Sequence, residues 1–125
     1  MLESIMVLHF SPTGGTRRAA RLLAESIAAQ VEEVDLTLSP VQAHDFGPED
    51  VVLVAGPVYG GRLPARMVQR LRACHGGGAR AVAAAVYGGR AYEDALVELA
   101  DVLEAQGFRV TAGATLLAEH SIAHA

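Results

Sequence analysis

The chain is poor in features that define several other classes of protein. Its only cysteine is Cys74, so it forms no internal disulfide and supplies no four-cysteine iron–sulfur or zinc site by itself. No apolar run approaches the roughly 20 residues needed to cross a bilayer. No Lys or Arg precedes the first apolar run, as it would in a secretory signal peptide. These absences predict a cytoplasmic protein with no membrane partner.

Charge and length set two more limits. The formal net charge is −4, which argues against nucleic acid as a partner, because clustered Lys and Arg hold phosphate backbones. A chain of 125 residues can bury one real core but not two. We therefore expect a single domain over residues 1–125.

Apolar residues follow two different strand patterns. Continuous apolar runs predict buried strands, whereas alternation of apolar and polar residues predicts edge strands. The continuous runs are at residues 5–10, 51–55 and 81–86, and the alternating segments are at residues 31–38 and 108–116. The alternating segments come second and fifth along the chain, a pattern that matches strand order 2-1-3-4-5.

Helical periodicity separates successive strands, which predicts an α/β fold with a parallel sheet covered on both faces. The helical segments are residues 17–30, 64–74 and 92–106. The apolar face of the first helix is formed by Ala19, Leu22, Leu23 and Ile27.

Proline and glycine mark where the helices begin, end or are absent. Pro64 suits the first position of its helix, and Gly107 suits a C-terminal cap. Residues 39–50 contain two prolines and a glycine, which predicts a loop with at most one helical turn. The second helix of the fold is therefore expected to be reduced.

Three glycine-bearing loops follow the carboxyl ends of the three central strands, at residues 11–16, 57–62 and 87–92. Ligands bind at this edge where the winding of the sheet reverses, between the first and third strands. The first loop leads into a helix N-terminus, whose N–H groups and dipole favour phosphate. Tyr59, with Tyr87 or Tyr92, can sandwich a flat ring. A phosphate and a flat ring together suggest a mononucleotide.

At these loops the chain resembles the flavodoxin-like family, over nearly its whole length. Ser11-Pro12-Thr13-Gly14-Gly15-Thr16 is similar to that family's loop for the phosphate of FMN. The two later loops, with Glu119-His120-Ser121, are similar to flavodoxin domains fused to a C-terminal ferredoxin module. The resemblance implies a doubly wound five-stranded sheet and electron transfer through FMN between redox partners, one of them ferredoxin-like.

The resemblance also implies which residues hold the cofactor. Those expected at the phosphate are Ser11, Thr13, Gly14, Gly15 and Thr16. Those expected around the flavin ring are Pro57, Val58, Tyr59, Gly60, Gly61, Tyr87, Gly88, Gly89, Arg90 and Tyr92. Gly60 and Gly61 would allow a peptide flip toward the ring, and the nearby acids Glu93 and Asp94 would disfavour an anionic reduced flavin.

The chain departs from the family in three ways. The family's fifth helix is missing, because the chain ends at Ala125 soon after its fifth strand. Half of one sheet face would then lie bare, so either the chain is shortened or a partner, such as a second copy in a homodimer, covers it. No ferredoxin module is present in this chain, and with no tryptophan any stacking on the flavin must come from tyrosine.

Two other functions use the same fold: a flavin-dependent NAD(P)H oxidoreductase, and an interaction module without cofactor. No second nucleotide loop supports the first, so we expect an electron carrier rather than a stand-alone enzyme. Cys74 and Arg80 match the Cys-x5-Arg spacing of cysteine phosphatases, but the expected helix precedes the cysteine where a strand should. His9 is expected to be a buried or hydrogen-bonded core residue, and Glu119, His120 and His124 a solvated terminus rather than a metal site.

Overall fold

The main sheet has strand order β2-β1-β4-β6-β7, and each neighbouring pair of strands is parallel. The structure is a computed structural model, and it describes residues 1–38, 43–87 and 93–117. The elements are, in chain order, β1 (Leu2–His9), α1 (Gly15–Ile27), β2 (Ala28–Asp35), β3 (His44–Asp45), β4 (Val51–Pro57), α2 (Ala65–Leu71), β5 (Cys74–His75), β6 (Arg80–Tyr87), α3 (Glu93–Ala105) and β7 (Arg109–Leu117). Among the main-sheet strands alone this is order 2-1-3-4-5, so the predicted flavodoxin-like sheet is confirmed.

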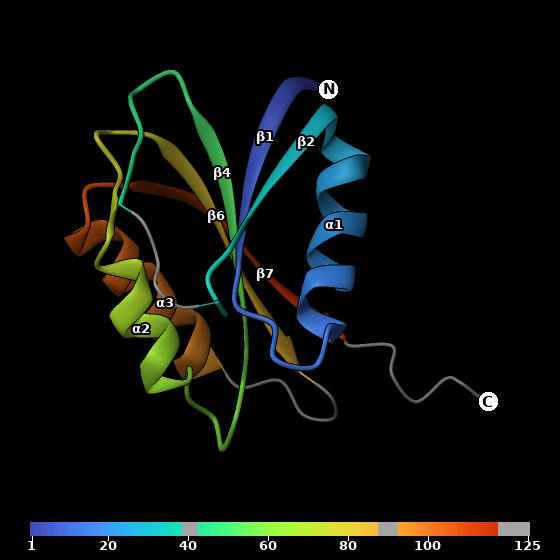
Figure 1. Ribbon diagram of the computed structural model, residues 1–125, viewed down its shortest axis with the longest axis vertical. Coiled ribbons are helices and arrows are strands. Elements are labelled where there is room, and N and C mark those ends of the chain that lie inside the picture. The colour runs from blue at the N-terminus through green and yellow to red at the C-terminus, as the bar shows by residue number, and fades with distance from the viewer. Residues whose placement is uncertain (39–42, 88–92, 118–125) are drawn as a thin grey trace.

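The helices form a layer on each face of the sheet, with α1 on one face and α2 and α3 on the other (Figure 1). Alternate residues of the central strands therefore enter different cores, and Val54 packs toward α2 and α3 while Leu53 packs toward α1. Both are fully buried. The helical periodicity of residues 92–106 corresponds to α3, whose Leu99 and Leu103 are fully buried.

The first helix differs from its prediction at its end and on its apolar face. It ends at Ile27 rather than residue 30, because Ala28 is extended and the next residues pair with β1. The buried side of the helix consists of Ala20 and Ala24, whose small side chains allow close packing on the sheet. Leu22, expected on the apolar face, is 63% exposed.

The region around α2 also differs from the sequence-based expectation. Pro64 is the extended N-cap of the helix rather than its first residue, and the helix ends at Leu71. Cys74, expected on that helix, lies in β5, which pairs with β3 in a two-stranded parallel sheet. Pairing with a segment 30 residues away replaces the last helical turn. No single-segment periodicity signals such a contact.

The face of the sheet that carries α1 is only partly covered. Among the described residues α1 is the only helix on that face, and none follows β7. Leu22 and Leu117, both more than half exposed, border a groove of about 290 Å³ with Arg18 and Leu116. The expected absence of a fifth helix concerns residues after Leu117, which lie outside the described ranges.

Candidate functional site

The first loop presents backbone N–H groups at the start of α1. Gly14 adopts φ 89°, a left-handed conformation that glycine tolerates without strain, and the helix begins at the next residue. The N–H groups of Gly14, Gly15 and Thr16 have no acceptor within the described residues. The next one, of Arg17, donates to Ser11 Oγ at 3.0 Å. Together with the helix dipole, these free donors form a site for an anion.

Residues after β2 hold this loop in place from the side. The Ser11 N–H donates to Thr37 Oγ1 at 2.7 Å, and the Thr37 N–H donates in turn to Asp35 Oδ1 at 2.8 Å. The Leu36 N–H donates to the His9 carbonyl at 2.7 Å, so the strand pair continues up to the loop. The anion site therefore has a backbone that is already positioned by hydrogen bonds from outside the loop.

A charged cluster lies beneath the loop, centred on Glu33 of β2. Its carboxylate accepts hydrogen bonds from Arg17 and Arg21 of α1 and lies 3.1 Å from Nε2 of His9. Hydrogen bonding from Arg17 lowers the Glu33 pKa, burial opposes this, and Arg21 lowers it further. His9 is 2% exposed, and its burial and its Nε2 contact agree with the expectation of a buried or hydrogen-bonded core histidine. Its Nδ1 makes no hydrogen bond to the described residues but lies 3.9 Å from Asp35 Oδ1.

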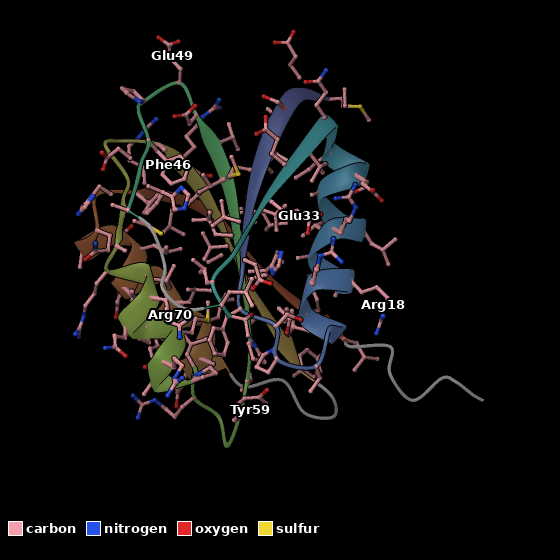
Figure 2. The ribbon with its side chains drawn as sticks, in the orientation of Figure 1. Arg18, Glu33, Phe46, Glu49, Tyr59 and Arg70 are labelled. Carbon is pink, nitrogen blue, oxygen red and sulfur yellow. The ribbon has the colours of Figure 1, made fainter. Side chains whose placement is uncertain are left out.

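The second loop reverses direction in two residues. The Tyr59 N–H donates to the Arg62 carbonyl at 2.8 Å and the Arg62 N–H returns to the Tyr59 carbonyl at 3.1 Å. Gly60 and Gly61 between them have φ 59° and 81°, the positive pair that such a turn requires. Tyr59 is 54% exposed beside this turn. Figure 1 shows the first two loops at the same edge of the sheet, and Tyr59 lies there in Figure 2.

A side chain of α3 fastens the base of the second loop. Glu98 accepts two hydrogen bonds from the Arg62 guanidinium, at 3.1 and 3.0 Å, and a third from the Leu63 N–H at 3.1 Å. Arg62 lowers the Glu98 pKa most, burial opposes it, and the Leu63 N–H lowers it further. No local pattern in the sequence predicts this contact, although Glu98 precedes the buried Leu99 in α3.

The remaining predicted site residues belong to the ends of β4 and β6 and to the third loop. Pro57 ends β4, and the N–H of Val58 donates to the Val86 carbonyl at 2.9 Å. Tyr87 ends β6 and is partly buried. Gly88, Gly89, Arg90 and Tyr92 lie outside the described residues, so their expected contacts with the flavin stay predictions.

The alternative sites find no support in the described residues. Cys74 is fully buried, and this burial raises its pKa to about 11, so its thiol is not activated as a phosphatase nucleophile would be. No cluster of His, Cys, Asp and Glu in the described ranges is arranged to bind a metal. Glu119, His120 and His124 lie outside those ranges. No described helix combines the length and apolarity needed to span a bilayer.

Solved structures share this fold at low sequence identity. A flavoprotein from Lactobacillus acidophilus NCFM, solved in complex with FMN, is 14% identical with a TM-score of 0.64, over 90% of this chain and 93% of that one. A putative flavoprotein from Bacteroides uniformis is 19% identical with a TM-score of 0.66, over 94% and 92% of the two chains. The rubredoxin:oxygen oxidoreductase of Desulfovibrio gigas is 17% identical with a TM-score of 0.58, over 91% of this chain but 30% of that one.

The sequence itself identifies the family. No curated protein matches it. Residues 6–76, more than half of the chain, match the family described as Flavodoxin domain. This segment contains the first two loops and the strands that carry them. The chain therefore belongs to the flavodoxin domain family.

Proposed function

We propose that the chain binds FMN across its three loops and carries electrons between redox proteins. The observation that carries this proposal is the set of free N–H donors at Gly14, Gly15 and Thr16, at the same sheet edge as the exposed Tyr59. A phosphate suits the donors and a flat ring suits the tyrosine. The FMN complex of the Lactobacillus acidophilus protein, which has the same fold, supports the choice of ligand.

The chain's own residues would bind the phosphate mainly through the backbone. Arg17 and Arg21 are already paired with Glu33, so the positive character of the site comes from the N–H groups and the helix dipole. Ser11 is held by Thr37 and can keep its hydroxyl beside the anion. Fixed donors of this kind need no rearrangement when the ligand arrives.

The second and third loops would position the flavin ring. Tyr59 would cover one face, and the backbone around Gly60 and Gly88 would contact the ring edge. Bound FMN supplies the redox chemistry, since it accepts and releases electrons singly or in pairs. The protein orients the ring, and it limits the water that reaches it. The partner we propose is a separate redox protein in the cytoplasm. The resemblance to flavodoxin domains fused to a ferredoxin module suggests that this partner is ferredoxin-like.

Titration of the protein with FMN and with riboflavin tests the proposal. We expect a yellow complex that survives gel filtration, and FMN binding about 100-fold tighter than riboflavin because only FMN engages the free N–H donors. Thr13→Asp adds a negative charge at the loop and should weaken FMN but not riboflavin. Thr111→Asp, the same change on an exposed residue of β7, is the matched control.

The outcomes separate the proposal from its rivals. No flavin complex under excess FMN would leave only a cofactor-free module and would refute the proposal. Equal affinities for FMN and riboflavin would refute the phosphate site. Rapid bleaching of the yellow complex on mixing with NADPH would instead identify an NAD(P)H oxidoreductase.

A further inference from the structure

Positive charge is concentrated in one part of a chain that is acidic as a whole. The net charge is −4, yet residues 51–92 contain no Asp or Glu. The same segment contains the arginines Arg62, Arg66, Arg70, Arg72, Arg80 and Arg90. The excess of acids must therefore lie elsewhere in the chain.

The fold places several of these arginines away from a group of acids, although Arg80, the first residue of β6, lies at the amino edge of the sheet. Figure 2 shows Arg18 and Arg70 toward the edge that carries Tyr59, whereas Glu49 lies at the opposite edge. Acids at that opposite edge line a hollow of about 300 Å³ with Ser4 and Met6: they are Glu32, Asp45, Glu49 and Asp50. Arginines without a carboxylate partner are thus found toward the carboxyl edge, and acids line the hollow at the amino edge.

Some of the arginines at the carboxyl edge are neutralised locally and others are not. Arg17 and Arg21 pair with Glu33, and Arg62 pairs with Glu98 and lies within electrostatic reach of Asp94. The remaining members of the group make no ion pair within the described residues: they are Arg18, Arg66 and Arg70.

These three arginines occupy both sides of the candidate site, whereas Arg72 is the C-cap of α2, at the end of that helix away from the loops. Arg18 lies on the first turn of α1, beside the first loop, and Arg66 lies on the first turn of α2, just after the second loop. Both side chains are exposed. Arg70 donates to the carbonyls of Leu36 and Leu38, so no carboxylate offsets its charge.

We propose that this arginine rim, defined by Arg18, Arg66 and Arg70, docks an acidic redox protein against the flavin edge. The inference rests on the proposed function and adds the charge of the partner to it. Opposite charges steer a partner during diffusion, and a polarised molecule turns its positive edge toward an acidic surface. The acids of the amino edge repel the same partner, which disfavours the wrong orientation.

The first test measures the sign of the charge that a reactant meets at the flavin. The reduced FMN-loaded protein is mixed with hexacyanoferrate(III), an anion, or tris(phenanthroline)cobalt(III), a cation. In each encounter one electron leaves the reduced flavin, and iron(III) becomes iron(II) or cobalt(III) becomes cobalt(II). We expect the rate with the anion to fall as salt is added and the rate with the cation to rise, opposite to what a net charge of −4 dictates.

Matched variants locate the effect. Arg66→Glu and Arg80→Glu change the net charge equally, but Arg80 begins β6 at the other edge of the sheet. We expect Arg66→Glu to slow the reaction with the anion by about fivefold at low salt. The substitution changes the local charge of the protein by two units, at about 10 Å from the approaching anion. Arg80→Glu should leave it within twofold. Equal effects of the two variants would refute the proposal, as would a rate with the anion that rises with salt.

A second test does not depend on flavin. Amide chemical shifts of the isotope-labelled protein are followed during addition of hexaglutamate or hexalysine. We expect hexaglutamate to shift amides at residues 14–18 and 62–66, and hexalysine to shift those at 45–50. Failure to load FMN with this pattern intact would refute the proposed function alone. A pattern with the two peptides exchanged would refute the docking surface alone, and salt-sensitive binding of a DNA duplex tighter than of hexaglutamate would reassign the rim to nucleic acid.

Discussion

Removal of the Glu98 side chain should loosen the second loop without disturbing the core. The carboxylate is partly exposed at 22% and fastens the loop through Arg62 and the Leu63 N–H. Glu98→Ala leaves that N–H, which is partly buried, without its acceptor. We therefore expect the folded protein to persist and the Tyr59–Arg62 turn to sample open positions.

The size of the effect follows mainly from the Leu63 bond. Leaving a partly buried donor unsatisfied costs about 1–2 kcal/mol. The Arg62 guanidinium is 71% exposed, so solvent screening makes its ion pair a minor part of the whole. A loop destabilised by this amount is in the binding position for a smaller fraction of time, and FMN affinity falls by that fraction, up to about tenfold.

The assay is FMN titration at pH 7, with Glu104→Ala as the control. Glu104 is an exposed acid on the same helix whose side chain makes no described contact, so the control removes the same charge and should leave affinity unchanged. Arg62→Ala should cost less than Glu98→Ala, since it leaves the Leu63 bond intact. The two flavin reduction potentials, measured on the same samples, should shift only in Glu98→Ala, because a looser turn contacts the ring differently.

Acid titration supplies the sign of the electrostatic contribution. The Glu98 pKa is lowered from its usual value near 4.5, so the carboxylate stabilises the loop fully above that value. The contribution is lost as pH falls through the lower pKa of the folded state. The difference between wild type and Glu98→Ala should be constant from pH 6 to 8 and disappear in stronger acid. Equal affinity and equal potentials in the two proteins at pH 7 would refute the reasoning.

Three further variants test the scaffold. Glu33→Gln should destabilise the protein by about 2 kcal/mol in urea at pH 7, because it weakens the bonds to Arg17, Arg21 and His9, and the loss should vanish in acid below the lowered Glu33 pKa. Gly77→Ala should lower the melting temperature strongly, because φ is 57° and a Cβ would clash with the Phe46 carbonyl oxygen, whereas Gly47→Ala meets nothing within 4 Å and is the control. Cys74, with its pKa of about 11, should resist iodoacetamide at pH 8 until the protein unfolds.

Much of the fold could be predicted because the apolar pattern of each of the five main strands matches how deeply that strand is buried. Val51–Ala55 is apolar at every position since both faces of β4 are buried, and the alternating segments became β2 and β7 at the edges. Gly107 caps α3 as expected, with φ 91° and a bond from the Phe108 N–H to the Leu103 carbonyl. In each case a local pattern agrees with the final packing.

The parts that could not be predicted depend on partners far along the chain. Leu22 follows a helical apolar pattern but is exposed, because α1 packs through Ala20 and Ala24 instead. Cys74 was predicted on a helix but lies in β5, where it pairs with His44 of β3. Apolar periodicity predicts which side of a helix is buried only where other elements cover that side. No second described helix packs on the face of the sheet that carries α1.

The candidate site shows the same division between local and distant information. Its loops were visible in the sequence, because turns and anion sites need glycines and hydroxyls at fixed spacing. Their supports were not visible, because Thr37 holds Ser11 from the end of β2 and Glu98 holds Leu63 from α3, 26 and 35 residues away. Neither support comes from the loop that it holds. The residues that tune flavin affinity and potential in this family member are therefore to be sought on β2 and α3 as much as in the loops themselves.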